Sequence, residues 1–268
     1  MIKEVTMKKN TVFKLLIILT IAILFRMYQL DKPEGLWNDE YIGWFIASKE
    51  SFSDFIKHML NNCHMPLYYI YLKIWMFLFG NSDLTLRMSS VLPSILSIPM
   101  MYLIGKEIKD KNTGLLASFL TSISSFHIYF AQEMRLYSLI FFLSTITTYY
   151  FFKCAKEQSK KNLLIYLFSN IILSATHTLG IVFSFFNIVA IFIYLYKTND
   201  KYKKLIKNFF NFLKQIIPFI IAICLLIPLI LNIIIRPSLS QFWSEFNILK
   251  ILFTFTDYFS AMQINIKK

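Results

Sequence analysis

The polar side chains that could do chemistry gather between residues 35 and 66 of an otherwise apolar chain. This stretch begins with the sequence GLWNDE at residues 35–40 and ends with HMP at residues 64–66. Adjacent carboxylates at Asp39 and Glu40, beside a tryptophan, provide a base that could accept a proton from a substrate hydroxyl. We therefore interpret residues 35–66 as a catalytic loop.

The same pair of acids also has a purely structural interpretation. Acidic residues are favoured in the first turn of a helix, where they complement the helix dipole, and Asn38 is a suitable N-cap. Taken alone, Asp39 and Glu40 are more typical of a helix start than of a catalytic site. The side of the membrane on which the loop lies, and what else lies there, decides between the two.

A second polar stretch, QEMRLY at residues 132–137, interrupts the apolar sequence further on. Charged residues at membrane depth are costly, and those that persist are usually paired or functional. Glu133 and Arg135 are two residues apart, a spacing that does not bring side chains together on a helix. We expect them to face another part of the protein, and an ordinary solvated turn is the alternative.

Composition identifies a membrane protein. Of its 268 residues 56% are hydrophobic and 16% are charged, against about 25% charged in soluble domains. The net charge of +13 would suggest a nucleic-acid partner in a soluble protein, but here the lysines gather in short connectors, which is a topology signal. The distant cysteines Cys63, Cys154 and Cys224 indicate neither a disulfide framework nor a zinc site.

The apolar runs predict an all-α, polytopic fold with about seven transmembrane helices. The first run, 11–30, begins on the cytoplasmic side, and we expect Arg26 near its outer end to extend toward the lipid headgroups. Six further runs contain no Asp, Glu, Lys or Arg: 88–104, 113–131, 137–152, 162–176, 179–196 and 215–235.

Residues 66–80 are apolar but short and contain Lys73, so we expect a helix lying on the membrane surface rather than a span. Residues 51–60 have the apolar spacing of a short amphipathic helix. With both segments at the surface, every lysine-rich connector is cytoplasmic, as the positive-inside rule requires. The chain then reads as one membrane domain: a first helix 1–30, an extracytoplasmic catalytic loop 31–87, a six-helix core 88–235 and an extracytoplasmic tail 236–268.

Four motifs then follow one another in a recognisable order: WNDE at 37–40, H-x-P at 64–66, GNS at 80–82 followed by Arg87, and QE-x-R-x-Y at 132–137. This succession resembles the superfamily C membrane glycosyltransferases that use polyprenyl-phosphate sugars. The group includes protein mannosyltransferases, aminoarabinose transferases and relatives that add galacturonic acid to lipopolysaccharide. The resemblance extends over roughly residues 12–196 and implies the N-terminal core module of proteins that are typically longer.

The resemblance implies roles for three acids. Asp39 matches the catalytic base, Glu40 its companion acid, and Glu133 the second acidic position of the family. A phosphate is a good leaving group when nearby cations stabilise its charge, so the acceptor hydroxyl mainly needs a base close to the anomeric carbon. Attack opposite the leaving phosphate predicts inversion at that carbon.

The resemblance also implies a group of substrate-binding residues. Basic side chains near the outer surface bind the lipid phosphate, and a histidine and an aromatic residue complete the motifs. The matching positions are His64, Arg87, Arg135 and Tyr137. The implied partners are a polyprenyl-phosphate sugar, an extracytoplasmic acceptor (lipid, glycan or protein) and the bilayer, without nucleic acid.

No cofactor is certain from the sequence. A divalent metal could bind through Glu40, His64 or His177, because carboxylates and imidazoles are common ligands. We nevertheless expect no tightly bound metal, with His127 as a packed histidine and His177 as a polar residue at a helix end.

Two alternatives to an active enzyme remain open. The chain would be a truncated, inactive remnant if the resembling module needs the part that longer relatives have. A non-enzymatic transporter of a lipid-linked sugar would favour polar residues near the bilayer midplane, whereas the charged residues here cluster toward one predicted surface.

Overall fold

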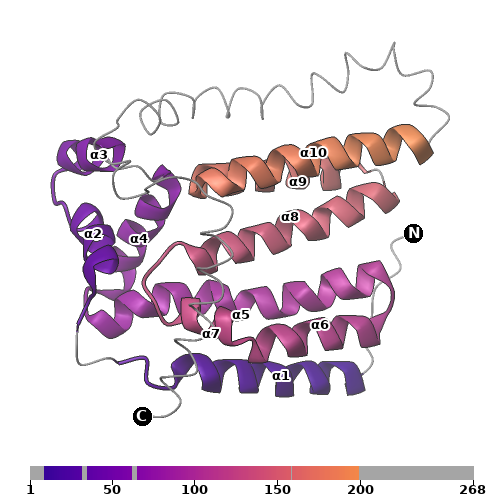
Figure 1. The fold of residues 1–268 in the computed structure, drawn as a ribbon, viewed down its shortest axis with the longest axis horizontal. Coiled ribbons are helices and arrows are strands. Elements are labelled where there is room, and N and C mark those ends of the chain that lie inside the picture. The colour runs from indigo at the N-terminus through magenta and orange to yellow at the C-terminus, as the bar shows by residue number, and fades with distance from the viewer. Residues whose placement is uncertain (1–8, 32–34, 62–64, 158, 199–268) are drawn as a thin grey trace, which may run out of the picture. The chain divides into compact units, whose positions relative to one another are not determined.

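The computed structural model describes residues 9–31, 35–61, 65–157 and 159–198. All regular structure in these residues is α-helical, so the predicted all-α fold is confirmed (Figure 1). The helices are α1 (Lys9–Met27), α2 (Asn38–Ala47), α3 (Phe52–Asn61), α4 (Pro66–Phe79), α5 (Asp83–Ile108), α6 (Lys111–Ile123), α7 (Ser125–Ala131), α8 (Tyr137–Glu157), α9 (Lys160–Thr176) and α10 (Thr178–Thr198). By its internal contacts the chain divides into Met1–Ile230 and Leu231–Lys268, and every described residue belongs to the first unit.

Three of the described helices, α1, α5 and α8, are long and apolar enough to cross a membrane. Helices α6 and α7 pass the same test only as a pair, bent by 59° at the break between them. The apolar part of α4, Pro66–Phe79, is shorter than a span, which needs about 17 residues or more, and that of α10, Thr178–Tyr194, is at this lower limit. The chain is therefore a multi-pass membrane protein. The described residues contain three such helices, or four if the bent pair is one span, and 215–235 lies outside them, so the total of seven spans stays a prediction.

Helix α5 is the centre of the described bundle, since it contacts α1, α4, α6, α7 and α8. Its approach to α6 is close because two glycines meet where the helices join. A Cβ atom on Gly105 would lie 2.8 Å from the Cα of Gly114, which is too near for any larger residue. Asp110 caps α6 by accepting a hydrogen bond of 2.8 Å from the backbone N–H of Thr113, so the hairpin is fixed at its turn.

The predicted surface helices are present as helices α3 and α4. Figure 1 shows them with α2 at one end of the bundle, and α4 contacts both α2 and α5. Pro66 begins α4, as its fixed φ and missing N–H favour at a first helical position. Lys73 of α4 donates hydrogen bonds to the carbonyls of Ala47 and Lys49, at 3.1 and 2.6 Å. Lys73, which in the sequence was a reason to expect that residues 66–80 do not cross the membrane, therefore caps the end of α2.

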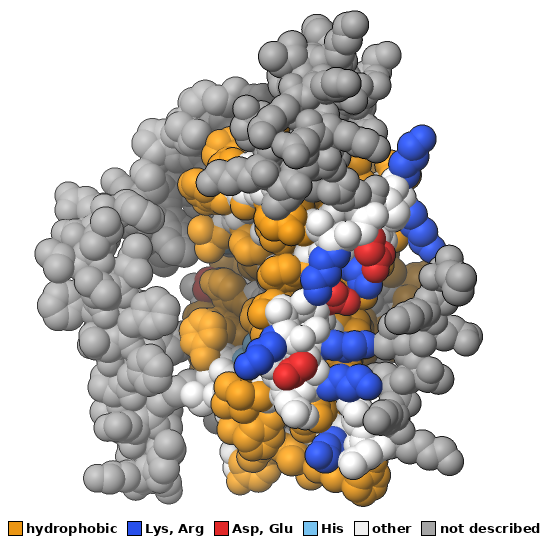
Figure 2. All heavy atoms as spheres, turned by 90° about the vertical axis from the view of Figure 1, so that its right-hand side faces the viewer, with side chains coloured by type: hydrophobic (Ala, Val, Ile, Leu, Met, Phe, Trp, Pro, Cys, Tyr) orange, Lys and Arg blue, Asp and Glu red, His pale blue; other side chains and the backbone are white. Residues whose placement is uncertain are grey.

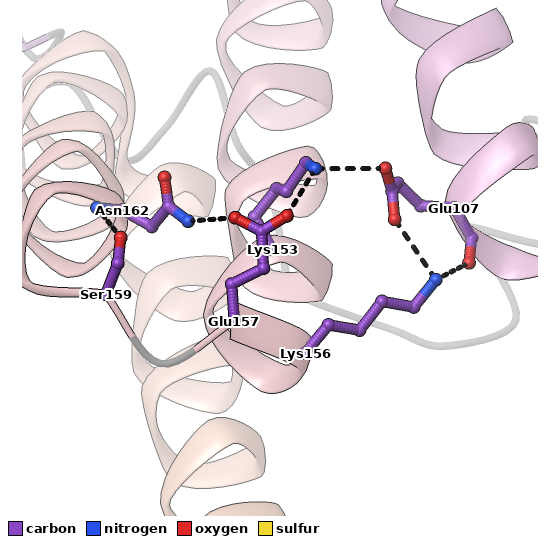
Figure 3. A network of polar contacts seen from close by, with 6 residues as sticks. All are labelled: Glu107, Lys153, Lys156, Glu157, Ser159 and Asn162. Atoms are coloured by element: carbon purple, nitrogen blue, oxygen red, sulfur yellow. Dashed lines mark hydrogen bonds and ion pairs between the residues drawn. The ribbon is translucent and has the colours of Figure 1, made fainter. Parts of the chain in front are cut away.

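A charged network joins three helices at the opposite end of the bundle (Figure 3). Glu107 of α5 lies 3.4 Å from Lys153 and 3.1 Å from Lys156 of α8. Glu157 pairs with Lys153 at 2.8 Å and accepts a hydrogen bond from Asn162 of α9 at 2.9 Å. Figure 2 shows lysine and arginine side chains crowding this end, with a few acids among them. That this end of the bundle lies on the cytoplasmic side remains a prediction.

Candidate active site

The N-terminus of α2 carries the two acids of the first motif. The structure places the N-cap at Trp37 rather than at Asn38, which is the first residue of the helix. The reason is Glu40, whose Oε2 atom accepts a hydrogen bond of 3.2 Å from the backbone N–H of Trp37. A carboxylate at the third helical position commonly reaches back in this way. Glu40 therefore has the structural role expected of an acid at the start of a helix.

Asp39 forms an ion pair with Arg135, which brings together motifs 96 residues apart in the sequence. The Asp39 side chain keeps 41% of its surface exposed, while Arg135 keeps 11%. The guanidinium lies between two aromatic rings, with Cζ 5.6 Å from the ring centre of Trp37 and 5.5 Å from that of Tyr137. The result is an accessible carboxylate beside a cation that aromatic faces hold in place.

A buried ion pair lies beneath this exposed one. Glu40 and Arg87 are each 1% exposed, with Oε2 and Nη2 3.7 Å apart. Glu40 Oε1 also accepts a hydrogen bond of 2.7 Å from the backbone N–H of Met134. Arg87 donates to the carbonyls of Leu30 at 3.3 Å and Gly35 at 2.5 Å. Together they fasten α2, α5, the end of α1 and the turn that carries Arg135.

The turn from Glu133 to Arg135 is held by further contacts to its backbone. Ser90 of α5 accepts from the N–H of Arg135 at 3.2 Å and donates to its carbonyl at 3.0 Å. The hydroxyl of Tyr68 on α4 donates to the carbonyl of Met134 at 2.9 Å. Burial raises the pKa of Tyr68 well above its usual value, so this hydroxyl keeps its proton and remains a donor. The guanidinium of Arg135 is thus carried on a rigid backbone.

The remaining predicted site residues differ in what the structure says of them. The Glu133 side chain is 6% exposed, so it is far less accessible than Asp39. The hydroxyl of Tyr137, at the start of α8, lies 3.4 Å from Nη2 of Arg135. His64 lies outside the described residues. His177 caps the end of α9, and its Nδ1 accepts from the N–H of Leu179 at 3.0 Å, as expected of a polar residue at a helix end.

The described residues contain no cluster of three or more His, Cys, Asp or Glu side chains that could hold a metal ion. Glu40 and His177, two of the predicted metal ligands, are used by the protein itself in helix caps. The cations next to Asp39 and Glu40 are instead the guanidinium groups of Arg135 and Arg87.

The prediction for Arg26 was wrong, because this side chain is fully buried rather than extended to the headgroups. It donates to the carbonyls of Thr121 at 3.2 Å and Ser122 at 3.0 Å, in the last turn of α6. These carbonyls lie just before the break between α6 and α7, where helix donors run out and lipid supplies none. Arg26 supplies the missing donors, which is why it is drawn inward.

Arg26 is also the centre of a polar cluster that sequence reasoning missed. Its Nε donates to Ser94 Oγ at 2.7 Å, and Nη2 lies 3.0 Å from Nδ1 of His127. Since arginine can only donate, Nδ1 accepts and the proton of the neutral imidazole is on Nε2, which lies 3.4 Å from Ser97 Oγ. His127 is buried as predicted, but hydrogen bonds as well as packing hold it. Serines at 94 and 97 in an apolar run were the available signal.

The comparison with known families agrees with this architecture. A family model described as dolichyl-phosphate-mannose-protein mannosyltransferase matches residues 63–237, which is more than half of the chain. The matched stretch contains Arg87, Glu133, Arg135 and Tyr137 and begins after Asp39 and Glu40. Among curated proteins no significant match is found.

Proposed function

The chain belongs to the dolichyl-phosphate-mannose-protein mannosyltransferase family, and from this premise we propose that it transfers a sugar from a polyprenyl-phosphate donor to an extracytoplasmic hydroxyl. Membership makes it a membrane glycosyltransferase at the level of the family. The donor, the acceptor and the residues that act on them are our proposal. The observation that carries it is the ion pair between the accessible Asp39 and the held guanidinium of Arg135.

In the proposed reaction, Asp39 is the base. The acceptor oxygen attacks the anomeric carbon, its proton passes to the Asp39 carboxylate, and the bond between that carbon and the phosphate oxygen breaks. The electron pair leaves with the polyprenyl phosphate, whose negative charge Arg135 stabilises. Because nucleophile and leaving group occupy opposite faces of the carbon, the configuration inverts.

Arg135 is better placed than Arg87 to meet the donor phosphate. Arg87 is 1% exposed and already binds Glu40 and two backbone carbonyls, so a phosphate would have to displace these contacts. Arg135 retains some exposure and has one ionic partner among the described residues, the half-exposed Asp39. We therefore assign the phosphate to Arg135 and a supporting role to Arg87, while Glu133 keeps its proposed role as the second acid.

The assignment of Asp39 is tested with the purified full chain in lipid vesicles, a labelled polyprenyl-phosphate sugar and a panel of hydroxyl acceptors. Asp39→Asn keeps the size of the side chain and removes its basicity. We expect the transfer rate to fall by a factor of about 100 or more, the usual scale for losing a general base. Undiminished transfer would refute the assignment.

Asp54→Asn is the matched control, because Asp54 is also an exposed acid in the first turn of a helix, α3. Its transfer rate should equal that of the unaltered protein. Both variants should show unchanged thermal unfolding, which separates a loss of chemistry from a loss of fold.

A further inference from the structure

Helix α9 has an exposed face that begins with lysines and continues with apolar side chains. Residues four positions apart lie on the same side of a helix, and this face has such a series: Lys160, Leu164, Phe168 and Ile172. Leu164 and Phe168 are 66% and 62% exposed, and Ile172 is half-buried. Lys160 and the adjacent Lys161 are both exposed. The helix therefore presents two cations at the head of an apolar stripe.

The two lysines are not neutralised by the described part of the protein. No ion pair or hydrogen bond joins Lys160 or Lys161 to another described residue, and the first turn of α9 contains no acid. The acid before them, Glu157, pairs with Lys153 at 2.8 Å and accepts from Asn162 at 2.9 Å (Figure 3). Two positive charges are left for a partner of another kind.

The turn before α9 is fixed, and the other described acids at this end of the bundle are engaged. Ser159 caps α9 by accepting a hydrogen bond of 3.1 Å from the backbone N–H of Asn162. Glu107 pairs with two lysines of α8, and Asp110 caps α6. The charges of Lys160 and Lys161 are therefore held in one place without a counter-charge.

An anionic phospholipid matches both parts of the α9 face. Its acidic headgroup supplies negative charge at the lysines, and its acyl chain covers the apolar stripe. From Lys160 to Ile172 the face extends about 18 Å along the helix, at about 1.5 Å per residue. One leaflet of a bilayer has a hydrocarbon thickness of about 15 Å. Because α9 packs against α8, which is long and apolar enough to cross a membrane, this face is placed to meet lipid.

Other occupants match only one part of the face. A soluble acidic protein would leave Leu164 and Phe168 in water. The apolar run 215–235 contains no Asp, Glu, Lys or Arg, so it would cover the stripe without neutralising the lysines. A zwitterionic lipid carries a cation close to its phosphate, which would lie against Lys160 and Lys161. Charge complementarity therefore selects an acidic headgroup.

We propose that the α9 face from Lys160 to Ile172 binds an anionic phospholipid of the bilayer. The headgroup lies at Lys160 and Lys161, and an acyl chain follows Leu164 and Phe168. The site belongs to the lysine-rich end of the bundle, opposite α2, α3 and α4 (Figures 1 and 2), so it is separate from the proposed active site and independent of sugar transfer. A lipid that binds only the folded chain also adds to its stability.

The test uses the full chain in phosphatidylcholine nanodiscs that contain phosphatidylglycerol with a photoreactive diazirine in its acyl chain. We expect saturable cross-links within residues 164–172, displaced by unlabelled phosphatidylglycerol and not by inorganic phosphate. A phosphatidylcholine with the same reactive chain should give no saturable labelling. Lys160→Gln combined with Lys161→Gln should weaken binding by about twentyfold at low salt, because each lysine near an anionic headgroup contributes about a factor of five.

Lys106→Gln combined with Lys109→Gln is the matched control. It removes the same charge from the same end of the bundle, at the C-terminal end of α5, and should bind the probe as the unaltered chain does. Lys160→Arg combined with Lys161→Arg keeps both charges and should retain binding. If the glutamine pair at 160 and 161 does not fold, raising the salt concentration with the unaltered chain should reduce the labelling instead, because salt screens exposed charges.

Several results would overturn the proposal. Equal labelling by the two lipids, cross-links outside residues 160–172, or labelling that neither the glutamine pair nor salt reduces would each exclude an anionic-lipid site on this face. Displacement by inorganic phosphate would show a site for a free anion. Equal weakening by both glutamine pairs would show a response to net charge alone. Each of these results leaves the proposed function standing.

Discussion

Asp39 and Glu40 are neighbours in the sequence but occupy different environments. The Asp39 side chain is 41% exposed and faces Arg135, whereas Glu40 is 1% exposed and is bound by Arg87 and two backbone N–H groups. A half-exposed carboxylate can take a proton from a substrate, while a buried one with all these partners is fixed in place. In the first turn of α2, Asp39 is therefore placed for the proposed chemistry, and its neighbour Glu40 is placed to hold the surrounding structure.

The first prediction follows from the buried pair. Glu40→Gln leaves the Arg87 guanidinium without its counter-charge, and removing one partner of a buried ion pair typically costs about 3–5 kcal/mol. We expect the free energy of unfolding, measured by denaturant titration in detergent, to fall by that amount.

Asp39→Asn provides the comparison, because an exposed ion pair contributes less than about 1 kcal/mol. Its free energy of unfolding should change little. If Glu40→Gln unfolds like the unaltered protein but loses transfer activity, Glu40 is a catalytic group rather than a support.

At the scale of elements, the break between α6 and α7 shows how this chain interrupts a membrane helix. Arg26 binds the carbonyls of Thr121 and Ser122 before the break, and Gln132 after it donates to the carbonyls of Phe25 and Tyr28 at 3.2 and 2.7 Å. The end of α1 and the α6–α7 segment therefore satisfy each other's helix termini. This arrangement sets the position of the turn that carries Arg135.

The prediction at this scale concerns Arg26→Met, which keeps an unbranched, flexible side chain but is shorter and has no donor. The carbonyls of the α6 terminus would be left without partners in an apolar environment, at a cost of about 1–3 kcal/mol for each buried group. We expect a lower melting temperature together with reduced transfer. Lys14→Met on the same helix is the control, because Lys14 is exposed, and a matching loss of stability in that variant would contradict the role given to Arg26.

Much of this helical framework could be predicted from hydropathy, and its departures have physical causes. The apolar run 88–104 corresponds to a longer helix, α5, because the Ser82 hydroxyl accepts from the N–H of Thr85 and starts the helix in a polar segment. The break at Ser124 could not be predicted, since its stabilising partner Arg26 is 98 residues away. Hydropathy is a property of one segment, whereas the end of a helix also depends on the side chains from other segments that hydrogen-bond to it.

Part of the candidate site could also be predicted from the sequence. Motif positions placed Asp39 and Arg135 on one side of the membrane, and the structure joins them in an ion pair. The division of roles between Asp39 and Glu40 was not predictable, because it depends on which carboxylate reaches the N–H groups of Trp37 and Met134. Arg87 likewise looked like a surface cation until its burial was known.

At the scale of the whole molecule, the account requires the two ends of the bundle to face different compartments. The proposed active site belongs to the end with α2, α3 and α4, and the lysine-rich network of Glu107 belongs to the other. The positive-inside rule then directs the site outward. We therefore predict that Glu50 lies on the extracytoplasmic side of the membrane and Lys109 on the cytoplasmic side.

The measurement is labelling of single cysteines in intact cells after Cys63, Cys154 and Cys224 have been replaced by serine. Glu50→Cys, between α2 and α3, should react with a membrane-impermeant maleimide, and Lys109→Cys, between α5 and α6, should react only after the cells are opened. Both positions are exposed, so burial does not decide the outcome. Labelling of both from outside, or the reverse pattern, would contradict the proposed orientation.

The central claim, that donor phosphate and acceptor base meet at the Asp39–Arg135 pair, is tested most directly by a structure with a non-hydrolysable polyprenyl-phosphate sugar bound. The account predicts a phosphate oxygen within about 4 Å of the Arg135 guanidinium, the ordinary limit of an ion pair, with the anomeric carbon turned toward Asp39. A phosphate bound at the Glu107 end of the bundle, or a sugar directed away from Asp39, would contradict it.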